Sequence, residues 1–482
     1  GRTGRPRDRG GVRRIVNSPR VAVVGGGISG LAAALALGDR APGARITVFD
    51  SADRIGGRID TSPFAGVDHV DEGADAFLAR VPEAVALATR VGLGDDLVSP
   101  EAVGAAVWHD GLHPIPDGLL LGVPGRIGPL ARSGLLSWRG KARAALEPLL
   151  PRTSTDDDSI GAYVRARFGD EVHERLVDSL VGSIYAADTD SFSLVEVPQL
   201  AALARDNRSL LLAARRQRAA QGTATAASGP IFAAPRSGMS ALTTATAGAF
   251  ETAGGTIVTG ASVESIEHSD DGFRLAVAGD GRADSPFAAV VFATPARATA
   301  AIVADVAPDA AALLARAETA DVIMVTLHVG ADQWPDRLRG MSGYLVPKPA
   351  QRWVTAASFG SQKWAHWRPP AGGEILRVSL GRDGVGVLHL SDDEVLRAVI
   401  DDLERHLGVA IEPLEVRITR WPGAFAQYRP HHRSWVGDVE RALPAGMFVT
   451  GAGFGGIGIP ACVRSGTAIA EQVHGQLTSL EE

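Results

Sequence analysis

The chain has 482 residues, of which 45% are hydrophobic and 21% are charged, and it carries a formal net charge of −7. This length is too great for one core of ordinary size, and the composition is that of a globular protein rather than a disordered one. The acidic balance provides no general basic surface, so we expect no nucleic-acid partner.

Cys462 is the only cysteine in the sequence. A single cysteine excludes an internal disulfide and a cysteine-based metal site, and it fits a reducing cytoplasm, which is the location we expect. Residues 1–19 are rich in arginine and glycine and predict a disordered leader. Arg13 and Arg14 are similar to a twin-arginine export signal, but the apolar run after them belongs to a cofactor motif, so export is not expected. No stretch reaches the roughly 18 apolar residues of a membrane-spanning helix.

The first elements predict a βαβ unit. Arg20 to Gly25 is a β-branched apolar run, Gly25 to Gly30 a glycine turn, Leu31 to Leu37 an Ala/Leu helix, and Arg45 to Asp50 a second strand. A doubly wound parallel sheet begins in this way, so we predict an α/β fold with a Rossmann-like domain.

The rest of the chain predicts two further units. Residues 81–220 read as a helical subdomain, with amphipathic stretches at 82–91, 159–181 and 200–218, and residues 221–230 read as a flexible loop. Short β runs return after 256, and those between 301 and 414 predict a mixed or antiparallel substrate-binding sheet domain. The Rossmann-like domain is then assembled from separated segments, namely 20–80, 231–300 and 415–482.

Gly25, Gly27 and Gly30 form a G-x-G-x-x-G turn between the first strand and the first helix. Small residues there allow backbone N–H groups to approach a pyrophosphate at the helix N-terminus. Asp50 follows Gly30 by 20 residues, where a carboxylate can bind a ribose hydroxyl. We therefore predict dinucleotide contacts along the turn, including Gly26, Ile28 and Ser29, and at Asp50 with its neighbour Ser51.

A second phosphate-binding device follows the acidic residue. Gly56 and Gly57 allow close approach, and the guanidinium of Arg58 can form a fork onto phosphate oxygens. Two such devices in tandem favour FAD over NAD. The pattern resembles the extended fingerprint of the amine-oxidase-like flavoprotein superfamily.

A third glycine-rich segment, GAGFGGIGIP, occupies 451–460 and precedes a helix at 461–473. We expect this helix N-terminus to face the flavin near Gly453 and to stabilise negative charge on the reduced ring. Cys462 in this segment leaves two interpretations open, a covalent flavin thioether and a small buried apolar residue.

Further segments together resemble the bacterial coproporphyrinogen/protoporphyrinogen oxidase family of haem synthesis, from about Arg20 to the C-terminus. They are DEGADAFLAR (71–80), HPIPDGLLLGVP (113–124), GKARAALEPLLP (140–151), SIYAADTDSFSL (183–194), TRWPGAFAQY (419–428) and GAGFGGIGIP (451–460). The resemblance implies further FAD contacts at Gly73, Ala74, Asp75, Ala76, Val263, Trp421, Ile457, Gly458 and Ile459.

The resemblance also implies a reaction. Members of the family take six electrons from a porphyrinogen substrate, pass hydride to flavin and return the electrons to oxygen as peroxide. No catalytic residue and no metal site can be assigned from the sequence. Arg80 is the candidate for a substrate propionate, with a solvated arginine as the alternative, and Tyr185 lines either the ring pocket or the core.

Several alternatives stay open. Coproporphyrinogen III oxidase is the first hypothesis and protoporphyrinogen IX oxidase the second. A flavin amine oxidase or a carotenoid-type desaturase is the third, although amine oxidases commonly place a lysine beside the flavin and only Lys141, Lys348 and Lys363 exist here. A non-catalytic flavoprotein is the last. Peripheral membrane contact of the helical region and transient contact with other haem-pathway enzymes are also left open.

Overall fold

The computed structural model describes residues 18–102, 104–156, 158–222, 230–278, 281–282 and 285–481. The predicted leader thus lies, up to residue 17, outside the described residues, and so does most of the predicted loop at 221–230. Within the described ranges no helix is long and apolar enough to cross a membrane.

A parallel sheet holds the N-terminal strand at its centre. Among the described residues its strand order is β12-β2-β1-β16-β22, and every pair runs parallel. The strands are β1 (Arg20–Val24), β2 (Arg45–Phe49), β12 (Thr256–Val258), β16 (Ala289–Phe292) and β22 (Met447–Val449). Sequentially distant segments build this sheet, which confirms the Rossmann-like α/β fold with separated pieces.

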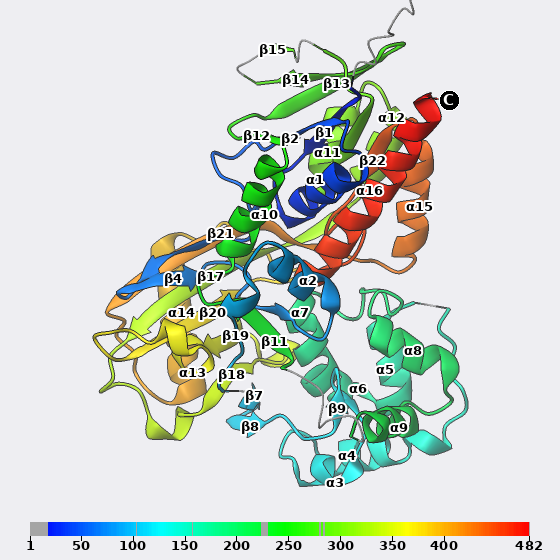
Figure 1. Ribbon diagram of the computed structural model, residues 1–482. Helices are drawn as coiled ribbons and strands as arrows, with labels where there is room; N and C mark the ends of the chain where they lie inside the picture. The colour runs from blue at the N-terminus through cyan, green and yellow to red at the C-terminus, as the bar shows by residue number, and fades with distance from the viewer. Residues whose placement is uncertain are drawn as a thin grey trace, which may run out of the picture.

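Three helices pack beside this sheet: α1 (Ile28–Arg40), α10 (Ser240–Thr252) and α16 (Ile459–Glu481). Helices α1 and α16 come from opposite ends of the chain and lie side by side (Figure 1). They approach closely because Gly466 carries no side chain: a Cβ there would lie 2.3 Å from the carbonyl oxygen of Ser29. The other face of the parallel sheet shares a hydrophobic core with three more helices. They are α11 (Ala296–Val303), α12 (Pro308–Leu314) and α15 (His432–Ala442).

A larger sheet, mostly antiparallel, forms the second unit. Its order in the described ranges is β21-β17-β20-β19-β18-β7-β8, and only β18 and β7 pair in parallel. The strands are β7 (Gly104–Trp108), β8 (Leu112–Pro114), β17 (Glu318–Val329), β18 (Met341–Leu345), β19 (Val354–Phe359), β20 (Glu374–Leu380) and β21 (Glu415–Gln427). Helices α13 (Gly360–Lys363) and α14 (Asp392–Leu407) accompany it, and α14 begins with a complete capping box at Ser391 and Glu394.

Two domain boundaries drawn from the sequence are corrected by this pairing. The sequence predicts residues 415–427 to lie in the cofactor domain, but β21 pairs with β17 along almost its whole length. Strands β7 and β8 lie in the range predicted to be helical, and β7 pairs with β18. Both segments pair with strands that are distant in sequence, so local pattern alone cannot assign them to a sheet.

Most of the helical unit lies at the opposite end of the molecule from α1, and the lower end of α16 points toward it (Figure 1). Its helices are α3 (Ile127–Arg132), α4 (Trp138–Ala145), α5 (Ile160–Phe168), α6 (Asp170–Val172), α7 (Ser183–Tyr185), α8 (Pro198–Asp206) and α9 (Leu210–Gly222). The single helix expected at 159–181 is interrupted, because Gly169 has a φ of +85° and ends α5. A π-helical stretch, η3 (His173–Gly182), follows α6.

Smaller elements connect these units. They are β3 (Thr61–Phe64), β4 (Val67–Asp71), β5 (Phe77–Leu78), α2 (Pro82–Arg90), β6 (Leu97–Val98), β9 (Leu119–Leu120), β10 (Val123–Pro124), β11 (Phe232–Pro235), β13 (Val263–Ser269), β14 (Gly272–Val277) and β15 (Gly281–Arg282). Strand β11 pairs with both β5 and β6. The residues that follow the predicted loop at 221–230 therefore lie beside residues 77–78 and 97–98.

Candidate active site

The N-terminal glycine turn connects β1 to α1. Gly25 has a φ of +109°, and a Cβ on Gly30 would lie 1.9 Å from the carbonyl oxygen of Gly25. Neither position can therefore carry a side chain without moving the backbone. A Cβ on Gly27 would meet nothing within 4 Å. The turn thus leaves open space in front of the α1 N-terminus, where a pyrophosphate fits.

Asp50 fixes this turn from the end of β2. One carboxylate oxygen accepts a hydrogen bond from the Gly26 N–H at 2.6 Å, and the other accepts from the Ala52 N–H at 2.9 Å. The backbone of Ala261, two residues before Val263, donates to the Asp50 carbonyl at 2.8 Å. The predicted ribose acid and Val263 are therefore brought to the same place.

The second glycine device lies against the first. The Gly56 N–H donates to the Gly26 carbonyl at 2.9 Å, and a Cβ on Gly57 would lie 3.4 Å from the Gly27 Cα. Both Gly56 and Gly57 have positive φ angles, +105° and +60°. The two sequence motifs thus form one continuous cradle of backbone.

Arg58 has no acidic partner among the residues that the structure describes. Its guanidinium lies 3.6 Å from the position of a Cβ on Gly423, and it interacts electrostatically with the Cys462 thiol. Burial lowers the pKa of Arg58, because a charged group without a counter-ion is destabilised away from water. An anionic group of a bound dinucleotide would supply the missing charge.

The C-terminal glycine loop, residues 451–458, reaches the same region. Gly451 lies against Ser29, since a Cβ there would be 3.5 Å from the serine Oγ, and the Cys462 thiol also interacts with Ser29. A Cβ on Gly453 or Gly458 would meet nothing within 4 Å. The N-termini of α1 and α16 therefore meet at one place, which favours an anionic ligand.

Cys462 is 8% exposed, and burial raises the pKa of its thiol. Its Sγ lies 3.8 Å from the Gly456 carbonyl oxygen. These contacts are those of a small buried residue, which supports the second of the two interpretations offered for it.

Trp421 and the segment Gly73–Ala76 lie beside this cradle. The Trp421 indole N–H donates to the Glu72 carbonyl at 3.1 Å. A Cβ on Gly73 would lie 3.5 Å from the Trp421 ring and 2.4 Å from the Arg58 carbonyl oxygen. The predicted flavin contacts from three parts of the sequence are thus neighbours in space.

The side chain of Asp75 is engaged by cations that sequence reasoning did not assign. Lys363 Nζ lies 2.8 Å from its carboxylate, Arg377 NH1 lies 3.6 Å away, and the Trp364 indole donates at 3.2 Å. Burial alone would raise the pKa of Asp75, but Lys363 and Arg377 outweigh burial and hold the pKa well below its usual range. Any flavin contact at Asp75 is therefore left to its backbone.

Tyr185 lies where the helical unit meets the larger sheet. Its ring stacks on Phe192 with centroids 5.1 Å apart, and its carbonyl accepts from the Gln427 side chain at 3.2 Å. Arg80 is exposed and follows β5, and it forms no hydrogen bond or ion pair with the described residues. The structure thus leaves both substrate roles as predictions.

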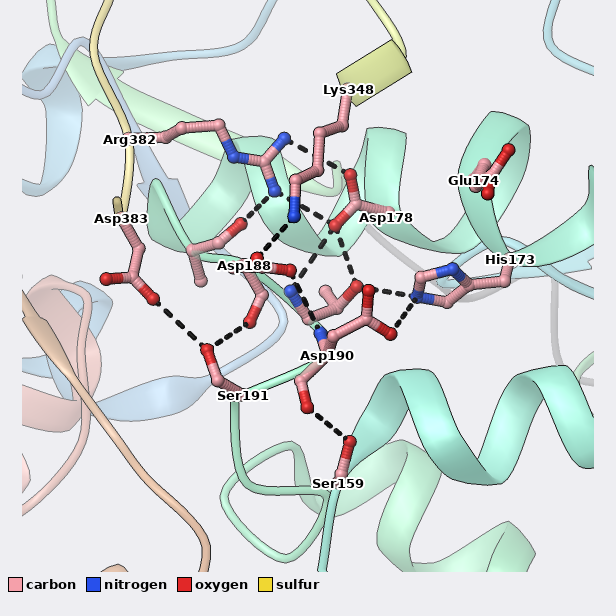
Figure 2. Close-up of polar contacts among 12 residues, drawn as sticks. Ser159, His173, Glu174, Asp178, Asp188, Asp190, Ser191, Lys348, Arg382 and Asp383 are labelled. Carbon is pink, nitrogen blue, oxygen red and sulfur yellow. Dashed lines mark hydrogen bonds and ion pairs between the residues drawn. The ribbon is translucent and has the colours of Figure 1, made fainter. Parts of the chain in front are cut away.

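A charged junction, made by Asp178, Asp188, Lys348, Arg382 and Asp383, fixes the segment that carries Tyr185 (Figure 2). Arg382 pairs with buried Asp178 at 2.9 Å and donates to the Ala187 carbonyl, and Lys348 pairs with Asp188. A polar cavity of about 370 Å³ opens beside it. The carboxylates that line the cavity are all paired, which indicates a structural joint between the two units.

No group of three or more His, Cys, Asp or Glu side chains in the described ranges could hold a metal ion. The missed residues Lys363, Arg377 and Arg382 share one property: each reaches a partner more than 200 residues away in sequence. No spacing rule could have identified them. Tyr428 ends the segment 419–428, one of those that carry the family resemblance.

Comparison with known proteins agrees with this geometry. The family model described as "Flavin containing amine oxidoreductase" matches residues 28–474. Coproporphyrinogen III oxidase of Mycobacterium tuberculosis is 34% identical, covering 94% of this chain and 98% of that protein, and the enzyme of Bacillus subtilis is 30% identical, covering 93% and 96%.

A solved structure has the same fold over nearly the whole chain. The putative protoporphyrinogen oxidase from Exiguobacterium sp. 255-15 superimposes with a TM-score of 0.82 at 28% identity, covering 95% of this chain and 99% of that one. The glycine cradle and the partnerless Arg58 fit the FAD that this kind of enzyme binds. The chain is therefore an FAD-containing oxidoreductase that belongs to the flavin-containing amine oxidoreductase family, among relatives that include the bacterial coproporphyrinogen III oxidases.

Proposed function

We propose that this chain oxidises coproporphyrinogen III to coproporphyrin III in haem synthesis, with FAD as its cofactor and oxygen as the final acceptor. One observation carries the proposal: the N-termini of α1 and α16, the glycine cradle, the C-terminal glycine loop and Arg58 converge on one place. They do so in a chain that is similar to coproporphyrinogen III oxidases over nearly its whole length.

The proposed reaction removes six electrons and six hydrogens from the substrate. Three oxygen molecules take them up and become three molecules of hydrogen peroxide. Bound FAD supplies the acceptor for the hydride that leaves a bridging carbon. Because aromatisation of the macrocycle favours the overall change, the residues of the chain need mainly to hold the substrate in a reactive orientation.

The region beside Asp75 suits a flat, negatively charged macrocycle. Leu78, Ile231 and Phe232, on and next to the paired strands β5 and β11, leave 40–47% of their surface exposed. Lys363 Nζ lies 6.0 Å from the centre of the Phe232 ring. Lys363 pairs with Asp75, and Arg377 interacts with both Asp75 and Asp71, so the Lys363 ammonium is the cation that lies beside the Phe232 ring. We propose that the macrocycle lies on the apolar edge and that a propionate approaches Lys363.

Arg80 and Tyr185 remain the proposed substrate contacts at the outer rim and at the joint with the helical unit. The cofactor contacts proposed from the sequence also remain, with Asp75 contributing its backbone. We propose that the parallel sheet and its helices bind FAD, and that the larger sheet and the helical unit enclose the substrate.

Peripheral membrane contact is proposed for one surface of the helical unit. Trp138 on α4 is 73% exposed, and Leu146 and Leu149 just beyond α4 are 53% and 75% exposed. Arg132 and Arg139 are exposed close by in the chain, and the guanidinium of Arg139 lies over the Trp138 ring. An apolar surface with basic neighbours suits an anionic membrane surface.

We propose the cytoplasm as the compartment, since one cysteine permits no internal disulfide.

Side-by-side kinetics with coproporphyrinogen III, protoporphyrinogen IX and a simple primary amine test the proposal. Porphyrin fluorescence and peroxide release would be measured together, with and without oxygen. We expect kcat/KM to be highest for coproporphyrinogen and peroxide to form in a 3:1 ratio to porphyrin. Equal or better turnover of protoporphyrinogen IX would make it the substrate in place of coproporphyrinogen III. Oxidation of the amine alone would refute both proposed substrates.

A further inference from the structure

The C-terminal glycine loop is held by aromatic side chains from the segment that follows β21. Tyr428 is 1% exposed, and its hydroxyl donates to the Ala452 carbonyl at 2.5 Å and accepts from the Gly456 N–H at 3.0 Å. One phenol therefore bridges two loop residues that are four positions apart. Burial raises the pKa of Tyr428 well above its usual value, so its hydroxyl stays protonated and able to donate.

Two more rings continue this contact. His432 stacks on Tyr428 with centroids 4.0 Å apart, and it forms a hydrogen bond with the backbone of Gly453. Trp435 stacks on Phe454 of the loop at 5.8 Å, with the ring planes nearly parallel at 4°. We refer to Tyr428, His432 and Trp435 as the aromatic clamp. The clamp contacts the loop at four of its residues, Ala452, Gly453, Phe454 and Gly456.

The loop needs such support because its own sequence gives it little. Gly451, Gly456 and Gly458 have positive φ angles of 107°, 114° and 100°, and a glycine-rich chain pays a large entropic cost to become ordered. Gly458 directly precedes α16, whose N-terminus lies in the proposed flavin site. The shape of the loop therefore decides where this helix end faces the flavin.

We propose that Tyr428 is a positioning residue whose hydroxyl holds the loop 451–458 in its FAD-binding shape before FAD arrives. The inference rests on the proposed flavin site but not on the identity of the substrate. The same ring stacks on Phe192, which in turn stacks on Tyr185, and the Tyr428 carbonyl accepts from the Ser193 N–H at 2.7 Å. The clamp thus also connects the loop to the segment that carries Tyr185, the proposed substrate contact.

Tyr428→Phe is the variant that tests this role, because it keeps the ring and removes only the hydroxyl. The Gly456 N–H and the Ala452 carbonyl would lose their partner, and we expect the dissociation constant for FAD, measured without substrate, to rise about tenfold. The visible spectrum of the bound flavin should change, and kcat should fall while KM for porphyrinogen stays the same. Tyr344→Phe is the matched control. Tyr344 lies on β18 of the larger sheet, and its buried hydroxyl forms a hydrogen bond with His406 at 3.1 Å.

Each outcome decides the inference. If Tyr428→Phe lowers thermal stability as Tyr344→Phe does but keeps the FAD affinity and flavin spectrum of the wild type, the hydroxyl is only structural and the inference is wrong. A wild-type protein that binds no FAD would instead refute the proposed function. Should Tyr428→Phe not fold, amide exchange in FAD-free wild type decides: protection of Gly456 supports a preformed loop, and free exchange overturns it.

Discussion

The carboxylate of Asp50 lies 2.6 Å from the backbone nitrogen of Gly26, so the acid at the end of β2 holds the turn after β1. Asp50→Ala removes this hydrogen bond and the one from Ala52, together with the proposed ribose contact. We expect the dissociation constant for FAD to rise at least about tenfold, as measured by flavin fluorescence quenching. Asp53→Ala is the control, because Asp53 is exposed three residues further along. Equal effects of both substitutions would contradict a specific role for Asp50.

Arg58→Met should raise the stability of the FAD-free protein and lower its affinity for FAD. The buried guanidinium has no acidic partner in the described ranges, so an apolar side chain of similar length should raise the melting temperature of the FAD-free protein. The increase in melting temperature on adding FAD should shrink, because the anionic ligand loses its counter-charge. Arg90→Met, which breaks an exposed pair with Asp39, should change neither quantity appreciably. An unchanged FAD-induced shift in Arg58→Met would show that Arg58 does not contact the cofactor.

The glycine cradle could be predicted from the sequence because its chemistry depends on short spacings. Gly25, Gly27 and Gly30 act through their backbone, and Asp50 reaches them by the ordinary geometry of a βαβ unit. The relation of Asp75 to Lys363 differs, because it joins residues 288 positions apart in the sequence. The role of Tyr428 likewise depends on a loop that returns 24 residues later. Tertiary packing alone brings such pairs together.

Lys363→Met tests the proposed propionate contact. Asp75 would keep Arg377 as its cation, so the fold should survive, while the positive charge beside Phe232 disappears. We expect KM for coproporphyrinogen, with four propionates, to rise about tenfold, and KM for protoporphyrinogen, with two, to rise less. Lys363→Arg keeps the charge and should restore most of the affinity, and Lys141→Met is a control for loss of a lysine. Identical changes in KM for both substrates would argue against a propionate at Lys363.

Trp138→Ala combined with Leu149→Ser should weaken binding to phosphatidylserine vesicles about tenfold in a flotation assay, because both substitutions remove exposed apolar surface. Turnover without vesicles should stay unchanged, since α4 lies at the end of the helical unit away from the FAD domain (Figure 1). Leu414→Ser is a matched control, as Leu414 is 66% exposed just before β21. If the wild type does not float with vesicles at low salt, the proposed membrane contact is wrong.

Asp71 should make stability depend on pH in a direction opposite to that of an ordinary paired carboxylate. Burial, at 1% exposure, raises its pKa to about 6, although hydrogen bonds from Thr61 and from the Met239 N–H partly oppose this. Because the folded protein holds this proton more tightly than the unfolded chain, the stabilising contribution is complete below about pH 4. It is lost as pH rises through 6, at a cost on the order of 3 kcal/mol.

Asp71→Asn keeps the oxygen that accepts both hydrogen bonds but cannot ionise. Its melting temperature relative to wild type should therefore increase between pH 4.5 and pH 7.5. Asp68→Asn, on the exposed face of the same strand, should show no such trend. Arg377 lowers and Asp75 raises the pKa of Asp71, so both charges contribute to where the transition falls. A difference between Asp71→Asn and wild type that stays constant across this pH range would mean that Asp71 is already ionised in the folded protein at pH 4.5.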